Sequence, residues 1–243
     1  MRIGIYAGDF GGGPADLMGQ VRQTVDAESD GFDCMWFTHI LAADSLIAVA
    51  VAGQQTSRIE LVTGVIPIYS RQPLLMAQQA LSFSDVPPPT VLLAALAPRM
   101  LRMAGEIADG TITWMTGPEA IRTHIAPRIT AAAQAAGRSQ PRICAALPIC
   151  VTDDARRGRE VAGDLFGRYG HLVNYRRVLD IEGVEGPQDV SVVGNEDEVE
   201  AQLRVLADAG ATDFFGGVYR LSDDDAESAP RTRALLRFLV GKI

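Results

Sequence analysis

The sequence predicts an α/β protein built from repeated strand–helix units, either a (β/α) barrel or an open doubly wound sheet. The clearest unit covers residues 90–118. In it, Thr90–Leu96 is an apolar run of strand length, Pro98 can open a helix, and Thr111–Met115 is the next apolar run. Runs without polar alternation are typical of strands buried on both faces, so we expect the two strands to lie parallel.

The same signals place the remaining elements and give about seven units. Strands are expected at Arg2–Ala7, Phe32–Thr38, Arg58–Ile66, Arg142–Val151 and Asp213–Tyr219, with Ser191–Gly194 as a loop or short extended piece. Helices are expected from residue 14 or 15 to Asp30, and over Ala43–Gln55, Leu74–Phe83, Pro98–Ala108, Pro118–Ala136, Ala155–Tyr169, Tyr175–Asp180, Glu196–Ala209 and Pro230–Val240. Left-handed glycines are predicted to end helices at Gly31, Gly110 and Gly137, and caps are predicted at Asn195 and at Thr152 or Asp153.

Composition limits the classes of partner. The chain has 243 residues, 47% of them hydrophobic, which suffices for one core, so we expect a single domain over residues 1–243. Its net charge is −8 and Lys242 is its one lysine, whereas nucleic acids and anionic membranes bind clustered Lys and Arg. No apolar run has membrane-spanning length, and residues 1–8 suit a strand rather than a signal peptide. We therefore expect a cytoplasmic protein that acts on a small molecule.

The three cysteines predict neither a metal site nor a disulfide framework. Cys34, Cys144 and Cys150 are an odd number, lie in apolar strand contexts and show no CxxC spacing. Buried free thiols are the favoured interpretation.

One histidine follows a predicted strand directly, and this position makes it a candidate for catalysis. His39 comes after the second strand, and in parallel α/β proteins ligands bind at the carboxyl ends of the strands. The alternative is a histidine that only hydrogen-bonds the loop backbone. The glycine-rich run of residues 8–13 fits neither common phosphate-loop pattern, so we interpret it as a loop beside the site. Aromatic and apolar residues at strand ends could line a substrate pocket or belong to the core: Phe10, Trp36, Trp114, Met115, Phe214, Phe215 and Tyr219.

Several motifs together point to a known family. They are Met1–Ile5, Glu28–Phe32 with Trp36, Thr63–Pro67 with Pro73, Ala77–Leu81, Ala104–Gly110, Thr113–Pro118 and Val151–Asp154. With these motifs, most of the chain resembles the luciferase-like monooxygenase superfamily, in particular its actinobacterial members that use the deazaflavin coenzyme F-420.

The resemblance implies a truncated fold. Relatives form an eight-stranded (β/α) barrel, with a fourth strand, an insertion and a further helix where this chain has only the proline-rich linker Ser84–Pro89. Roughly 60 residues are missing if a complete barrel with its insertion is the reference. We therefore expect a truncated TIM-like barrel of about seven β/α units, as in the seven-unit non-fluorescent flavoprotein of luminous bacteria.

The resemblance also implies where a cofactor would bind. His39 is similar to a polar residue near the redox face of the cofactor ring, and Gly64-Val65 to a non-prolyl cis peptide behind that ring. Ala95, Leu96 and Ala97 are similar to the backbone segment that meets the cofactor phosphate, and Arg99 follows in the first turn of a helix, which favours anions. Arg71 and Arg102 are further cations for the phosphate and the acidic tail. Relatives usually have glycine at the position of Ala97, and a methyl group there opposes a close phosphate approach.

Two functions from different classes remain open. The first is an oxidoreductase that transfers hydride between coenzyme F-420, or FMN, and a small organic substrate in secondary metabolism, with His39 assisting proton transfer. The second is a cofactor-free descendant, a cyclase or pericyclase or a binding protein for a bulky apolar natural-product intermediate. A third is a scaffold that only dimerises. Because a missing strand leaves unpaired edges, we also expect a homodimer with helices near the deletion at its interface.

Overall fold

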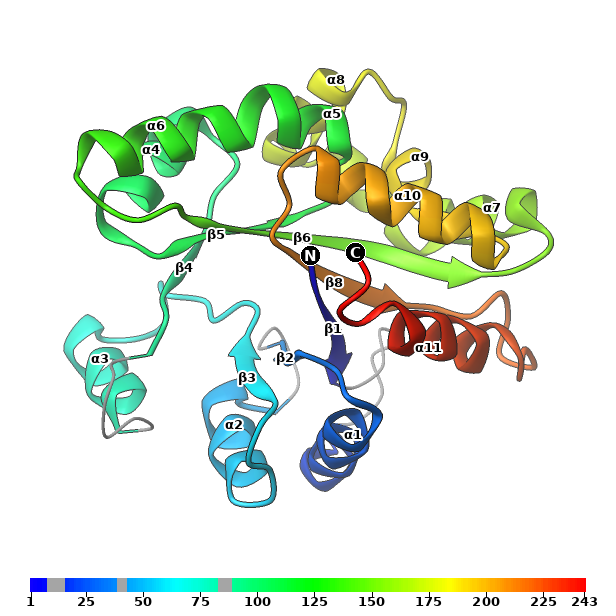
Figure 1. Cartoon of the computed structure of the whole chain (residues 1–243), viewed down its shortest axis with the longest axis horizontal. Coiled ribbons are helices and arrows are strands. Elements are labelled where there is room, and N and C mark those ends of the chain that lie inside the picture. The colour runs from blue at the N-terminus through cyan, green and yellow to red at the C-terminus, as the bar shows by residue number, and fades with distance from the viewer. Residues whose placement is uncertain (8–15, 39–42, 83–88) are drawn as a thin grey trace. The chain divides into compact units, whose positions relative to one another are not determined.

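The computed structural model describes residues 1–7, 16–38, 43–82 and 89–243, and the chain divides into two compact units (Figure 1). One unit consists of Gly4–Val91, and the other consists of Met1–Ile3 with Leu92–Ile243. Both are parallel α/β structures, as predicted. Strand β1 (Arg2–Ala7) contributes residues to both.

The Gly4–Val91 unit has three parallel strands. β1 pairs with β2 (Cys34–Phe37), and β2 pairs with β3 (Glu60–Thr63). Its helices are α1 (Leu17–Asp30), α2 (Ser45–Gly53) and α3 (Pro73–Leu81). α1 ends at Gly31 with φ of +91°, the left-handed cap that the sequence predicts. α3 differs from the other two helices because it buries no residue.

Glu28 joins two segments of this unit. Its carboxylate accepts hydrogen bonds from the backbone N–H groups of Ser57, Arg58 and Ile59, which lead into β3. These backbone donors favour the charged form and lower the pKa of Glu28. The carboxylate therefore fixes the entry to β3 from the last turn of α1.

Strand β6 is central to the other unit. It spans Arg142–Val151, with the bounds that the sequence predicts, and it pairs in parallel with β5 (Gly110–Trp114) and β8 (Asp213–Val218). β5 pairs in turn with β4 (Leu92–Ala94). Ile149 pairs with both Val192 of β7 (Val192–Gly194) and Val218 of β8, and because a strand residue has one partner on each edge, β7 and β8 lie on opposite edges of β6. The short extended piece expected at residues 191–194 is thus a strand.

Helices cover these strands (Figure 1). They are α4 (Pro98–Ile107), α5 (Pro118–Ala120), α6 (Ala126–Ala135), α7 (Ala155–Phe166), α8 (Val173–Glu182), α9 (Pro187–Val190), α10 (Glu196–Asp208) and α11 (Ser228–Leu239), with a 3-10 turn at Gly167–His171. α4 packs closely on α6, since a Cβ at Gly105 would lie 2.5 Å from the Ile129 carbonyl oxygen. Asn195 caps α10 as predicted, reciprocally with Glu198.

Two predicted helix ends are wrong. Gly110 does not cap a helix: α4 is followed by Ala108 in an extended conformation, and Gly110 begins β5. A side chain at Gly110 would collide with the backbone of Arg142, so close strand approach explains the glycine. The cap of α7 is Asp154, whose carboxylate accepts from Arg157 N–H at 2.9 Å, rather than Thr152 or Asp153.

The long helix expected over residues 118–136 is interrupted by a π turn, Ile121–Ile125. There the N–H of Ala126 donates to the carbonyl of Ile121, five residues back. Pro127 gives the physical reason, because it has no N–H for the carbonyl of Thr123 and its ring crowds the preceding turn. The guanidinium of Arg128 bonds the carbonyls of Thr123 (3.3 Å) and His124 (2.9 Å) instead.

A buried ion pair stabilises the amino ends of the strands. Asp213 is 1% exposed and accepts hydrogen bonds from Arg142 at 2.6 Å and from the Thr212 hydroxyl at 2.6 Å. Arg2 contributes a weaker contact of 3.4 Å. The amino ends of strands in such folds serve stability rather than catalysis.

The three cysteines are buried and form no disulfide among the described residues, which agrees with the prediction of buried thiols. Within the described ranges, no helix is long and apolar enough to cross a membrane, and no group of three His, Cys, Asp or Glu residues could hold a metal ion. Within each unit the described strands pair in parallel and alternate with helices, in agreement with the predicted truncated (β/α) barrel. Whether the chain folds as a single domain stays a prediction.

Candidate functional site

The carboxyl ends of β4 and β5 lie side by side in the larger unit. Ala94 pairs with Ile112, so the segments that follow the two strands start next to each other. The hydroxyl of Thr111 donates to the carbonyl of Leu93 at 2.9 Å and lies 3.3 Å from that of Ala95. Thr111 is fully buried and thereby fixes the exit of β4. Four predicted cofactor residues, Ala95, Leu96, Ala97 and Arg99, follow this exit directly.

Helix α4 begins without a side-chain cap. Ala97 is its N-cap residue, in an extended conformation (φ −80°, ψ 147°), and Pro98 occupies the first turn. These angles are ordinary for alanine, so the local backbone does not require the glycine that relatives usually have here. Arg99 is exposed in the same turn, and no hydrogen bond or ion pair joins it to the described residues.

The other helices that follow strands in this unit have their first N–H groups bonded by side chains. Glu182 accepts from Ala120 at the start of α5 (2.7 Å), and Asp154 and Asn195 cap α7 and α10. Asp225 accepts from Ser228 at the start of α11 (3.0 Å). α4 alone among the five described strand–helix junctions of this unit has no such acceptor. Its free N–H groups and positive dipole end suit an anion from outside the chain.

The segment after β5 holds an unusual backbone conformation. Met115 has φ of +54°, a region that bulky residues seldom occupy, and its side chain is fully buried. Such outliers cluster at ligand sites, where the surrounding structure imposes them. The outlier therefore supports a site at the carboxyl ends of β4 and β5.

Aromatic rings gather around Trp114, the last residue of β5. Trp114 is half-buried and meets Phe166 and Tyr169 edge-on, with ring centroids 5.9 and 6.1 Å apart. Tyr169 meets Tyr175 at 5.0 Å, and burial, with Tyr169 nearby, raises the pKa of Tyr175. Phe166 also contacts Tyr219 at 5.9 Å. These rings form an apolar wall in which Phe166 and Tyr219 are buried and Trp114, Tyr169 and Tyr175 are partly exposed.

Tyr219 has a structural place in this wall. Its hydroxyl donates to the carbonyl of Gly158 at 2.9 Å, and burial raises its pKa far above the usual range for tyrosine. Phe214 and Phe215 are also buried, at 0 and 4% exposure. That Met115 and Phe215 line a substrate pocket stays a prediction.

The Gly4–Val91 unit carries the other predicted residues. The Gly64–Val65 peptide bond is cis, as predicted. The N–H of Gly64 donates to the carbonyl of Phe37 at 2.8 Å, and the hydroxyl of Thr38 donates to the carbonyl of Gly64 at 3.0 Å. The cis peptide thus lies at the carboxyl ends of β2 and β3.

Two side chains of this unit have other partners. Trp36 is fully buried, and its indole N–H lies 3.1 Å from the sulfur of Cys34, so its place in a substrate pocket stays a prediction. Arg71 is paired with Asp44 and hydrogen-bonded to Gln79. Burial alone would raise the pKa of Asp44, but bonds from Arg71 and two backbone N–H groups lower it. Arg71 is therefore less available to a phosphate than Arg99. His39 and Phe10 lie outside the described residues.

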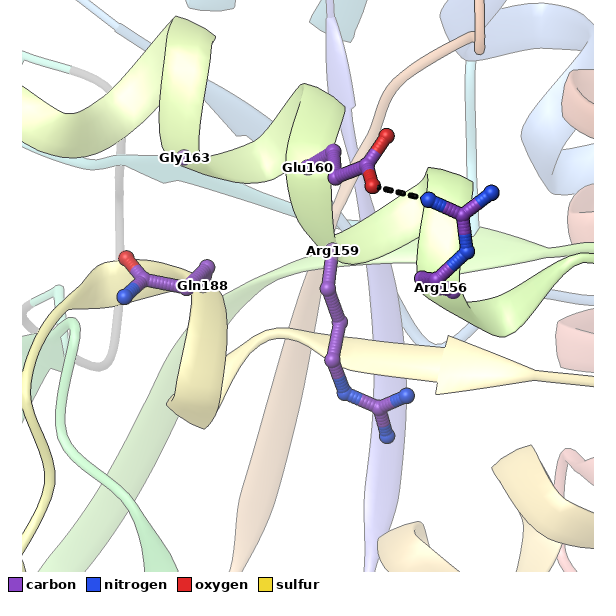
Figure 2. Close-up of a pocket in the computed structure, with 5 residues that line it drawn as sticks. All are labelled: Arg156, Arg159, Glu160, Gly163 and Gln188. Carbon is purple, nitrogen blue, oxygen red and sulfur yellow. Dashed lines mark hydrogen bonds and ion pairs between the residues drawn. The ribbon is translucent and has the colours of Figure 1, made fainter.

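An open groove of about 630 Å³ runs along α7 beside α9 (Figure 2). Its lining residues are Arg156, Arg159, Glu160, Gly163 and Gln188. Arg156 pairs with Glu160 at 2.5 Å, whereas Arg159 extends away from that pair (Figure 2). None of the predicted site residues lines this groove, so we do not assign it to the candidate site.

Sequence reasoning missed two residues beside the site. The Glu182 carboxylate, which caps α5, comes from α8 and gives no local signal. His124 lies in the π turn, is 8% exposed, and contacts the carbonyl of Leu96 through Nε2 at 2.7 Å. Pro127 inside a helical pattern was the available signal for the π turn.

Comparisons with known proteins agree with this architecture. An F-420-dependent secondary alcohol dehydrogenase, solved with an F-420–acetone adduct, superposes with a TM-score of 0.74 at 14% identity, over 100% of this chain and 98% of that one. The F-420-dependent tetrahydromethanopterin reductase of Methanopyrus kandleri gives 0.66 at 15% identity, over 100% and 97%. The oxygenating constituent of 3,6-diketocamphane monooxygenase from Pseudomonas putida, solved with FMN, gives 0.74 at 13% identity, over 99% and 96%. At such identities the likeness establishes the fold.

A search of curated protein sequences found no match. The family model of luciferase-like monooxygenases, however, matches residues 1–86 and 81–213. The resemblance in the sequence is thereby confirmed at the level of the family, while the actinobacterial branch and the lost strand stay predictions. The chain belongs to the luciferase-like monooxygenase family.

Proposed function

We propose that this protein is an oxidoreductase that transfers hydride between a deazaflavin or flavin and a small organic substrate. The observation that carries the proposal is the start of α4. There, N–H groups without a side-chain cap and Arg99, which has no partner among the described residues, offer a place for a phosphate. Family membership and structural neighbours that use F-420 or FMN support it. Coenzyme F-420 is the first candidate cofactor and FMN the second.

The residues present fit such a cofactor at its phosphate end. Backbone N–H groups at the start of α4 and the guanidinium of Arg99 would hold the phosphate, with Arg102 one turn further along. Arg102 lies 3.6 Å from Glu106 on an exposed face, a contact weak enough to exchange for a ligand. Gly64 and Val65 are proposed to support the ring. When bound, the cofactor supplies the hydride chemistry.

The chain's own side chains would position the substrate. Trp114, a partly exposed member of the aromatic wall at the end of β5, offers an apolar surface next to the β4 and β5 exits. His39 is proposed to assist proton transfer, because a histidine titrates near neutral pH. The substrate class follows from the wall: a small, largely apolar molecule of the kind that secondary metabolism produces.

Titration of the purified protein with oxidised F-420 and with FMN tests the proposal. We expect micromolar binding of one of them by calorimetry. Arg99→Ala should weaken it roughly tenfold or more, since a hydrogen bond to a charged group contributes about 1.5–3 kcal/mol. Arg156→Ala is the matched control, because it removes the same charge from α7, in the groove of Figure 2.

A second variant tests the catalytic role. His39→Ala should leave cofactor affinity nearly unchanged and reduce turnover by about 10²- to 10⁴-fold. Binding of neither cofactor, together with turnover in cofactor-free buffer, would overturn the redox proposal in favour of a cofactor-independent cyclase.

We also propose a homodimer. Helix α3 buries no residue, and the chain exposes apolar side chains on it and just before it, including Tyr69 at 90% and Leu74 at 81%. A nine-residue helix has little stability without packing. Light scattering at micromolar concentration should give twice the chain mass, and Leu74→Glu should shift it towards the monomer. A monomeric wild-type mass would contradict the proposal.

A further inference from the structure

We propose that His124 is a positioning residue that fixes the anion-binding start of α4 through its hydrogen bond to Leu96. The inference deepens the proposed function and rests on it. His124 is buried, and its Nε2 lies 2.7 Å from the Leu96 carbonyl oxygen. A carbonyl oxygen only accepts hydrogen bonds, so Nε2 carries the hydrogen and donates it.

This bond acts on the peptide group next to the proposed phosphate position. Leu96 immediately precedes Ala97, the N-cap residue of α4. In a planar trans peptide the carbonyl and the following N–H point in opposite directions. Holding the Leu96 carbonyl towards His124 therefore aims the N–H of Ala97 away from His124.

The π turn brings His124 to this position. The turn holds one residue more than an α-helical turn, so it rotates the residues before Pro127 relative to α6. Arg128 bonds the carbonyl of His124 at 2.9 Å and stabilises the turn from the exposed side. Regular helix over residues 118–136 would place this side chain elsewhere around the helix axis.

A second contact fixes α4 further along. Gly105 allows α4 to approach α6 so closely that a Cβ there would lie 2.7 Å from the Cβ of Ala132. This contact fixes the last turn of α4, whereas the bond from His124 fixes the segment before its first turn. The start of α4 has no side-chain cap of its own, so the bond from His124 holds the backbone just before the helix without occupying its first N–H groups.

Replacing His124 by Asn and by Gln, two amides of different length, separates its positioning role from an effect on the stability of the whole protein. The amide nitrogen of Gln reaches nearly as far as Nε2 of His, whereas Asn is too short to reach Leu96. We expect His124→Asn to speed exchange of the Leu101 amide hydrogen, which bonds the carbonyl of Ala97 at 2.9 Å, at least tenfold in the cofactor-free protein, with His124→Gln close to wild type. His171→Asn is the control, because His171 is an exposed histidine in the 3-10 turn.

Binding gives the second readout. The Kd for FMN or F-420, whichever the wild type binds, should rise about tenfold in His124→Asn and recover in His124→Gln. A lower Tm with unchanged local exchange and unchanged Kd would mean a purely structural histidine and would overturn the inference. If the wild type binds neither cofactor, the proposed function fails, and the exchange measurement still decides whether His124 fixes this segment: wild-type exchange in His124→Asn would overturn that as well.

Discussion

The hydroxyl of Thr232 accepts a hydrogen bond from the backbone N–H of Val151 at 2.8 Å, and both residues are fully buried. Pairing of β6 with β8 ends at Ile149, so Thr232 of α11 satisfies the next N–H on that edge. Thr232→Val keeps the shape and removes the acceptor. The free energy of unfolding should fall by about 1–3 kcal/mol in urea titration, the cost of an unsatisfied buried donor. Thr232→Ser retains the hydroxyl, so its free energy of unfolding should fall clearly less. Equal decreases in the free energy of unfolding in both variants would contradict this account.

Two helical glycines should respond to alanine with opposite signs. Alanine stabilises a helix interior by about 1 kcal/mol relative to glycine when its methyl has room. At Gly163 the nearest atom to an added Cβ is 3.8 Å away, so Gly163→Ala should raise Tm. At Gly105 the Ile129 carbonyl oxygen would be 2.5 Å away, so Gly105→Ala should lower Tm by separating α4 from α6. A rise in Tm for Gly105→Ala would mean that the two helices are packed less closely than described.

Asp225 should contribute stability that depends on pH. Burial alone would raise its pKa, but hydrogen bonds from the Ser228 hydroxyl and from three backbone N–H groups lower it well below the ordinary 3.8. A lowered pKa in the folded state means that the stabilisation is complete above about pH 4 and is lost as the pH falls through the folded value.

Asp225→Ala should therefore lower Tm at pH 7, and its difference from wild type should shrink below pH 4. The control is Asp224→Ala, a neighbouring exposed carboxylate, which should leave Tm nearly unchanged at both pH values. A difference for Asp225→Ala that stays constant down to pH 2 would exclude the ionised carboxylate as its cause.

Cys150 should be unreactive in the folded protein. Burial raises the pKa of its thiol to about 11, against a smaller opposing effect from Ser228. Because the thiolate is the reactive species, iodoacetamide at pH 8 should leave Cys150 unmodified by mass spectrometry until guanidinium unfolds the chain. Rapid alkylation under native conditions would show that this part of the core opens.

Local signals in the sequence sufficed for much of the fold. The apolar run of β6 gave its bounds, and Pro98, Gly31, Gly137 and Asn195 correctly marked helix ends, because each acts through its own backbone or the first turn next to it. Gly110 was misassigned because a glycine is required there by the close backbone of Arg142 on the neighbouring strand. No local sequence pattern indicates that two strands approach so closely.

The candidate site was predicted only in part. The sequence and its resemblance placed Ala95–Ala97 and Arg99 at a helix start after a strand, which the structure has at α4, because such a start is a local feature; their role in cofactor binding stays a prediction. His124 was not found, because its importance comes from a contact across 28 residues that exists only if the helix contains a π turn. The sequence did not predict that Glu182 caps α5 either, because Glu182 and its partner Ala120 are 62 residues apart in the chain.

The pairing of β6 has a consequence for how this protein is made. One edge of β6 is covered by β5, which precedes it, but the other edge is covered by β8, which is synthesised more than 60 residues later. A nascent chain on the ribosome therefore displays a ten-residue apolar strand with one open edge until residues 213–218 have emerged. Open edges of this kind recruit other chains, so yield in a cell should depend on translation speed and chaperones between β6 and β8.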